Sequence, residues 1–273
     1  MHAAPPLARR PLLRAAACAV AGAALWRPQP ARAEVIDLND AINQAGRQRM
    51  LSQRMAKAWL ALAQGVEAAN ARQVLDRSVA LFERQLGDLR AYAPNAELRT
   101  TYAQLEAAWA GYRAALLAPP APAAAPALLQ ADARVLALAH QGTVQYESAQ
   151  ALPVGHLVNL AGRQRMLSQR MAKFYLAAAL PEGGATAQAE IAQARGEFLQ
   201  AMQTLRGAPQ ATQRIQDELQ IADGQWVFFE AALRRIQPGG TPGAKPLSDV
   251  FVASENLLSV MDRVTGLYAA LKA

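Results

Sequence analysis

Basic side chains gather in a thirteen-residue block that occurs twice in the chain without a mismatch. The block, AGRQRMLSQRMAK, occupies residues 45–57 and again residues 161–173, and each copy holds three arginines, one lysine and no acidic residue. A guanidinium presents its donors in a flat fork that suits planar anions, and a partly buried one is costly to leave unpaired. Two intact copies inside halves that otherwise differ indicate where the chemistry of this protein lies.

Arg49 and Arg165 are the arginines that the pattern sets among small and apolar residues. At about 100° per residue, Arg49 shares a helical face with Gly46, and Arg165 shares the equivalent face with Gly162. The glycines would let another backbone come close. Two interpretations remain open at this stage. Each arginine binds a small planar anion, or each pairs permanently with an acid of another helix and the block serves only to pack the helices together.

The other two arginines of each block fall on a different side of the same helix. In the first copy these are Arg47 and Arg54, which are seven positions apart. From the pattern alone they are either solvated or in contact with acidic groups elsewhere.

Similarity between the two halves continues beyond the block, at offsets that grow from 116 to 122 residues. Self-similarity at this spacing indicates two copies of a domain-sized unit, with the insertions in loops. We therefore predict tandem domains at residues 34–152 and 153–273, each large enough to hold its own core.

Strong helix formers dominate the chain after residue 33, and no alternating strand pattern is present. Proline and glycine clusters divide each half into four stretches. We predict an all-α fold of two tandem antiparallel four-helix bundles. The sequence leaves open whether the bundles pack against each other or lie end to end. The predicted helices cover residues 35–64, 67–92, 95–117, 127–150, 155–180, 185–207, 210–236 and 247–271.

Residues 1–33 have the pattern of an export signal peptide. A basic start at Arg9 and Arg10 precedes a weakly apolar stretch, and residues 31–33 form an A-x-A cleavage site. The paired arginines also resemble a twin-arginine signal, with the general export route as the alternative. A lipoprotein signal at Cys18 fits the sequence less well, and the apolar run is short for an uncleaved membrane anchor. We expect a periplasmic protein.

Charge and residue types exclude several classes of protein. The net charge of +7 falls to +2 without residues 1–33, and the two blocks alone carry +8, so the chain is not a general nucleic-acid binder. The one cysteine leaves with the signal, so helix packing alone must hold the fold. His140 and His156 lack metal-site spacing, and we interpret both as surface or helix-end residues. Since no nucleophile–base set occurs either, we expect no cofactor, no metal and no enzymatic activity.

The run AINQAGRQRMLSQR, residues 41–54, resembles the P-box of the PilJ/NarX-like sensor domain family. This family comprises the N-terminal domains of type IV pili chemotaxis transducers and of nitrate-sensing histidine kinases. The skeleton N-x-A-G-x-x-R-M-x-S-x-R carries the match and occurs twice. The resemblance implies periplasmic four-helix bundles and, as in the nitrate sensors, one nitrate between the first helices of two subunits. The ligand-binding residues it implies are Arg49 and Arg165 with Gly46 and Gly162 and, secondarily, Met50, Arg54, Met166 and Arg170.

Members of that family usually continue into a signalling module, which we do not expect after Ala273. The leading hypothesis is a periplasmic binding protein for nitrate, nitrite or a similar small anion that reports to a membrane sensor or chemoreceptor. Two P-boxes in one chain suggest a covalent pseudo-dimer in which Arg49 and Arg165 clamp one anion. A homodimer that pairs Arg49 with its copy in another chain is the rival geometry.

The alternative function is a ligand-free accessory or interaction module of a chemosensory or type IV pilus system. Both arginines would then form permanent ion pairs. Buried acids beside both side chains would favour this alternative, whereas an acid-free pocket between the helices would favour anion binding.

Overall fold

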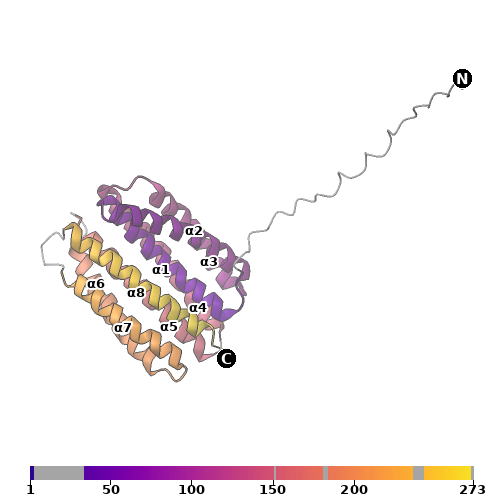
Figure 1. Ribbon diagram of the computed structural model, residues 1–273. Coiled ribbons are helices and arrows are strands. Elements are labelled where there is room, and N and C mark those ends of the chain that lie inside the picture. Colours follow the sequence, from indigo (N-terminus) through magenta and orange to yellow (C-terminus); the bar gives the residue numbers. More distant parts are fainter. Residues whose placement is uncertain (3–33, 151, 181–183, 236–242, 272–273) are drawn as a thin grey trace. The chain divides into compact units, whose positions relative to one another are not determined.

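The computed structural model describes residues 1–2, 34–150, 152–180, 184–235 and 243–271 (Figure 1). The predicted signal peptide lies almost entirely outside the described residues and stays a prediction. Within the described ranges, all regular structure is helical, and none of these helices is both long and apolar enough to cross a bilayer.

All eight predicted helices are present, with ends within three residues of the predicted positions. The predicted all-α class and the bundle architecture are thereby confirmed. The helices are α1 (Leu38–Ala63), α2 (Ala68–Tyr92), α3 (Ala96–Leu117), α4 (Ala125–Ala149), α5 (Pro153–Ala178), α6 (Gly184–Gly207), α7 (Gln213–Leu233) and α8 (Ala244–Ala269).

Prolines expected to separate helices begin them instead at two places. Pro126 lies in the first turn of α4, after a short 3₁₀ helix, η1 (Pro122–Ala124), and Pro153 is the first residue of α5. Proline suits the first turn because the N–H it lacks has no partner there in any case. Side-chain caps are present at the starts of α1, α3 and α7. The Asp37 carboxylate accepts the Asp40 N–H at the start of α1.

The two bundles lie side by side, with α1 and α5 at their shared interface (Figure 1). In the first bundle α1 packs against α2 and α4, and in the second α5 packs against α6 and α8. The most extensive helix pairing in the described chain is that between α1 and α5, so residues 33–273 form one compact unit. This arrangement answers the question that the sequence left open. The domain boundary between residues 152 and 153 stays a prediction.

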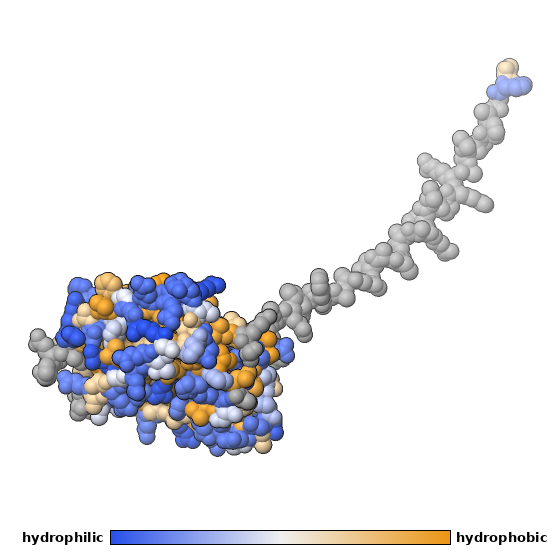
Figure 2. All heavy atoms as spheres, turned by 90° about the horizontal axis from the view of Figure 1, so that it is seen from below, coloured by the Kyte–Doolittle hydropathy of each residue, from blue (hydrophilic) through white to orange (hydrophobic). Residues whose placement is uncertain are grey.

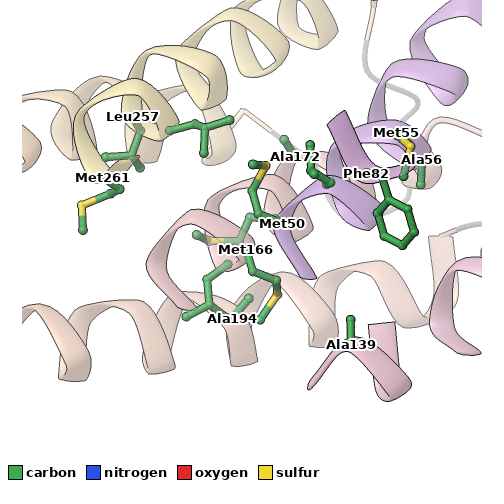
Figure 3. Packing of buried hydrophobic residues seen from close by; sticks show 14 of the residues in the cluster. Met50, Met55, Ala56, Phe82, Ala139, Met166, Ala172, Ala194, Leu257 and Met261 are labelled. Carbon is green, nitrogen blue, oxygen red and sulfur yellow. The ribbon is translucent and has the colours of Figure 1, made fainter. Parts of the chain in front are cut away.

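The cores of the two bundles repeat each other. Phe82 stacks on Trp109 with ring centroids 4.2 Å apart, and Phe198 stacks on Trp226 at 4.6 Å. Figure 3 shows part of the continuous core, with side chains from α1, α2, α4, α5, α6 and α8 in one cluster. Because α1 and α5 have neighbours on both sides, most of their residues are buried. Hydrophilic residues cover most of the face seen in Figure 2, with hydrophobic residues scattered among them.

Candidate functional site

The backbones of α1 and α5 come close to each other at two glycines of the repeated block. A Cβ atom placed on Gly46 would lie 3.8 Å from the Gly162 Cα. The same point would be 3.3 Å from Nη2 of Arg49 and 3.5 Å from Nη2 of Arg165. Glycine in a helix interior is unfavourable by roughly 0.5–1 kcal/mol relative to alanine, and here its absent side chain leaves room for two guanidinium groups.

Each of the two arginines reaches across the interface into the other repeat. Nη2 of Arg49 donates to the Asn159 backbone carbonyl at 3.3 Å and to its Oδ1 at 2.6 Å. Nη2 of Arg165 donates to the Asn43 carbonyl at 3.0 Å. Asn43 and Asn159 are the first residues of the two skeletons, so the contacts are related by the pseudo-twofold symmetry of the repeats. The structure thus brings together the two arginines and the two glycines that the sequence singled out.

The two arginines differ in what they meet on the fourth helix of their own bundle. Nη1 of Arg165 donates to Oδ1 of Asp262 at 2.6 Å, whereas Nη1 of Arg49 donates to Nδ1 of His140 at 3.3 Å. His140 corresponds to Asp262 at the 122-residue offset. Nε of each guanidinium is buried and has no hydrogen-bond partner among the described residues. The site therefore holds two cations and one direct carboxylate partner.

Burial and the neighbouring cations shift the titration of this group. Burial, followed by the charges of Arg163 and Arg165, lowers the pKa of Arg49 to about 9. Burial lowers the pKa of Arg165 to about 10, although Asp262 raises it. Both guanidinium groups are still charged at neutral pH. Two like charges are therefore held together in a desolvated place, which favours the binding of an anion there.

His140 contributes to this site, although its spacing suggested an ordinary surface residue. Burial and then Arg49 lower the pKa of its imidazole, so the ring is neutral at neutral pH. A guanidinium has no acceptor, so Nδ1 must accept the hydrogen bond from Arg49. The alignment of His140 with Asp262 was the one sequence signal for this role. His156 is exposed and hydrogen-bonds to Glu147.

Some residues of the repeated block are accounted for by packing alone. The side-chain amides of Gln48 and Gln164 donate to the carbonyls of Phe82 and Phe198, at 3.2 and 3.1 Å. The hydroxyls of the serines at positions 52 and 168 donate to the carbonyls three residues before them, at 2.9 Å in both copies. Exact repetition of the block thus preserves a scaffold as well as its charges.

The two lysines of the block form crossed ion pairs that join the repeats. Nζ of Lys57 lies 2.7 Å from the Glu255 carboxylate and 2.8 Å from the Ser254 hydroxyl of α8. Nζ of Lys173 lies 2.6 Å from the Asp132 carboxylate of α4. Burial lowers the pKa of Lys57 to about 8, although Glu255 raises it. Sequence reasoning did not find these pairs because their partners lie about 40 or 200 positions away.

The remaining predicted ligand residues do not converge on the two glycines. Arg54 pairs with Glu255 at 2.5 Å, and Arg170 pairs with Glu190 at 2.5 Å. Met50 and Met166 are buried in the hydrophobic core. Arg47 and Arg163, which the pattern left as solvated or paired, each contact an acid: Asp262 for Arg47 and Glu197 for Arg163.

The fold and the site together define a duplicated helical-bundle sensory domain whose first helices share a cationic interface. The family model described as "Type IV pili methyl-accepting chemotaxis transducer N-term" matches residues 37–139 and 146–259. The chain belongs to this family and carries two tandem copies of its domain, as the P-box resemblance indicated. It is a sensory module of the type related to pilus chemotaxis. No curated protein and no solved structure matches the chain significantly.

Proposed function

We propose that the chain is an exported, periplasmic sensor domain that binds one small inorganic anion, such as nitrate or nitrite, between α1 and α5. The observation that carries the proposal is the convergence of two buried guanidinium groups on the space left by Gly46 and Gly162. An anion in that space would accept hydrogen bonds from both Nη2 atoms and offset their repulsion. It would bind on the pseudo-twofold axis of a single chain, and not between two chains.

Binding on this axis offers a way to transmit a signal. The anion would draw Arg49 and Arg165 toward the axis and away from the Asn159 and Asn43 carbonyls that they now contact. Such a change shifts α1 against α5, and a membrane-bound chemoreceptor or sensor could detect the shift. The chain itself would then supply the recognition and its partner the output.

A ligand-free interaction module is the second candidate function, and one contact favours it. Arg165 already has the carboxylate of Asp262 as a partner at 2.6 Å, which is the permanent ion pair that this alternative requires. Arg49 has no direct acidic partner among the described residues. The permanent ion pair is therefore present for Arg165, but the described residues do not provide one for Arg49. A bound anion would provide Arg49 with a negatively charged partner, and we prefer the anion-binding function for that reason.

Calorimetric titration of residues 34–273 with nitrate, nitrite, sulfate and chloride tests the proposal. The same titration is repeated on an Arg49→Lys/Arg165→Lys variant, which keeps both charges and removes the planar fork. An Arg49→Ala/Arg165→Ala variant removes the charges as well. Arg113→Ala/Arg263→Ala is the matched control, because it deletes two arginines whose ion pairs are surface-exposed.

Saturable nitrate binding near one per chain, weakened in both site variants and unchanged in the control, is the expected result. Half a ligand per chain would instead place the site between two molecules. Absence of heat with every anion, together with an unfolding temperature that saturating anion does not raise, would support the interaction module.

A further inference from the structure

A cleft of about 290 Å³ opens between α4 of the first repeat and α5 and α6 of the second. Its apolar wall includes Leu136 and Met166, and its polar groups are Arg49, His140, Arg163, Arg170, Gln193 and Glu197. Three arginines thus face one glutamate in the lining. The cleft lies beside the pseudo-twofold axis and is separate from the space between the two glycines, although Arg49 borders both.

At the pseudo-equivalent place in the other half of the molecule, two acids of α8 pair with the basic residues. There Glu255 of α8 pairs with Arg54 and Lys57, and Asp262 pairs with Arg47 and Arg165. At the 122-residue offset, the two acids correspond to Ala133 and His140, which both border the cleft. The two acids of α8 therefore have no counterpart on α4. On the cleft side Glu197 and Glu190 of α6 pair instead with Arg163 and Arg170, and Arg49 has no direct acidic partner among the described residues.

Arg49 is the least well compensated cation of the cleft. Arg163 pairs with Glu197, and Arg170 pairs with Glu190, both at 2.5 Å. Arg49 instead has the amide of Asn159 and the neutral ring of His140, whose Nδ1 accepts at a long 3.3 Å. A carboxylate is a much stronger acceptor for a guanidinium than a neutral imidazole. A ligand carboxylate that turned His140 aside would take its place on Nη1.

We propose that this cleft binds a small organic carboxylate with a short apolar body. The carboxylate would take, on Arg49, the place that the Asp262 carboxylate has on Arg165, and the apolar body would lie against Leu136 and Met166. A volume of about 290 Å³ is at the lower end for small-molecule sites, which suits a monocarboxylate of a few carbon atoms. This second site goes beyond the inorganic-anion site and does not depend on it.

The test introduces into the cleft a counterpart of one acid that α8 carries in the other repeat. Ala133→Glu places a carboxylate where Glu255 stands in the other repeat, beside Arg170. Ala127→Glu is the matched control, because residue 127 is exposed on the same helix and does not border the cleft. Residues 34–273, parent and variants, are titrated calorimetrically with sodium butyrate and sodium benzoate, and separately with nitrate.

We expect the parent and Ala127→Glu to bind at least one of the two carboxylates, and Ala133→Glu to bind it at least about tenfold more weakly. Nitrate binding should be equal in all three proteins, and this result would distinguish the cleft from the proposed nitrate site between Gly46 and Gly162. Failure of nitrate to bind while a carboxylate binds would refute the proposed function and leave this inference standing. Absence of carboxylate binding in the parent, or equal binding in Ala133→Glu, would overturn the inference. His140→Ala, which uncovers Arg49, should bind the carboxylate at least as tightly as the parent does.

Discussion

At the scale of single residues, the pair His140 and Asp262 distinguishes the two halves of this protein. The residues occupy equivalent positions and contact equivalent arginines, yet one is a carboxylate and the other a neutral ring. The charge of Arg165 is therefore compensated by the carboxylate of Asp262, whereas Arg49 donates to neutral polar groups. This single difference leaves Nη1 of Arg49 without the carboxylate partner that Nη1 of Arg165 has.

Removal of the Asp262 carboxylate should destabilise the protein. Asp262→Asn leaves Arg165 buried without a charge partner, and we expect a loss of about 2 kcal/mol, moderated because the Asp262 side chain is 43% exposed. Chemical denaturation by urea measures the change. Asp223→Asn, which breaks the surface pair with Arg206, is the control and should cost less than about 1 kcal/mol. Equal losses in the two variants would contradict this account.

The opposite substitution at the equivalent position should stabilise the protein. His140→Asp provides Arg49 with the carboxylate that Arg165 already has, and we expect a gain of about 1 kcal/mol in the free energy of unfolding. The same variant should bind carboxylates more weakly, because an internal anion now occupies the place of the ligand. A decrease in stability would show that Arg49 is already satisfied in the parent protein.

At the scale of helices, the contact of α1 with α5 depends on residues without side chains. Gly46 and Gly162 bring the two backbones close and leave the space on which the guanidinium groups converge. Glycines elsewhere differ: Gly224 of α7 has nothing within 4 Å of the position of its missing Cβ. The interface glycines thus allow the close packing of α1 and α5, which is a reason to retain them in a helix interior.

Alanine at these two kinds of position should have different effects. In Gly46→Ala the methyl group would occupy the space between the two Nη2 atoms, so we expect nitrate binding to weaken by about tenfold or more. Stability should change by less than about 1 kcal/mol, because only the ends of flexible side chains must move. Gly224→Ala should leave binding unchanged and add about 0.5–1 kcal/mol of stability. Calorimetry and urea unfolding on both variants provide the comparison.

At the scale of the whole molecule, the ion pairs that join the repeats set the response to acid. Burial raises the pKa of Glu255 and Asp262, but their basic partners outweigh it and lower both values to about 2, from ordinary values of 4.5 and 3.8. A lowered carboxyl pKa stabilises the fold above the ordinary value, and this contribution is lost as the pH falls toward the folded-state value.

Stability should therefore decline between about pH 4.5 and pH 2. Urea unfolding at a series of pH values measures the decline. In Glu255→Gln/Asp262→Asn the curve should be flatter over that window, starting from a lower stability at neutral pH. A curve of unchanged slope would mean that other carboxylates dominate the acid response.

A single repeat should not be stable as a monomer. Residues 34–150 alone would expose the side of α1 that α5 covers, and Lys57 would lose its partner Glu255. We expect this fragment to self-associate, with Lys57 meeting the Asp132 of a second copy as Lys173 does in the intact chain. Sedimentation measurements on the fragment and on residues 34–273 test this, and a folded monomeric fragment would contradict it.

The helices, their number in each half and the family could all be predicted from the sequence. These features depend on local chemistry and on self-comparison: breakers between helical stretches, and a repeated skeleton that marks Arg49 and Arg165. The small residues beside these arginines also predicted a close approach of backbones, which Gly46 and Gly162 provide.

The charges that are compensated could be identified only from the three-dimensional contacts between helices. The partners of Lys57, Lys173 and Arg165 lie on helices distant in sequence, and an ion pair depends on distances of a few ångströms that no local pattern encodes. The eight basic residues look equivalent in the two blocks, but the tertiary contacts distinguish them. Most form ion pairs with acids of other helices, whereas Arg49 hydrogen-bonds to His140 and Asn159.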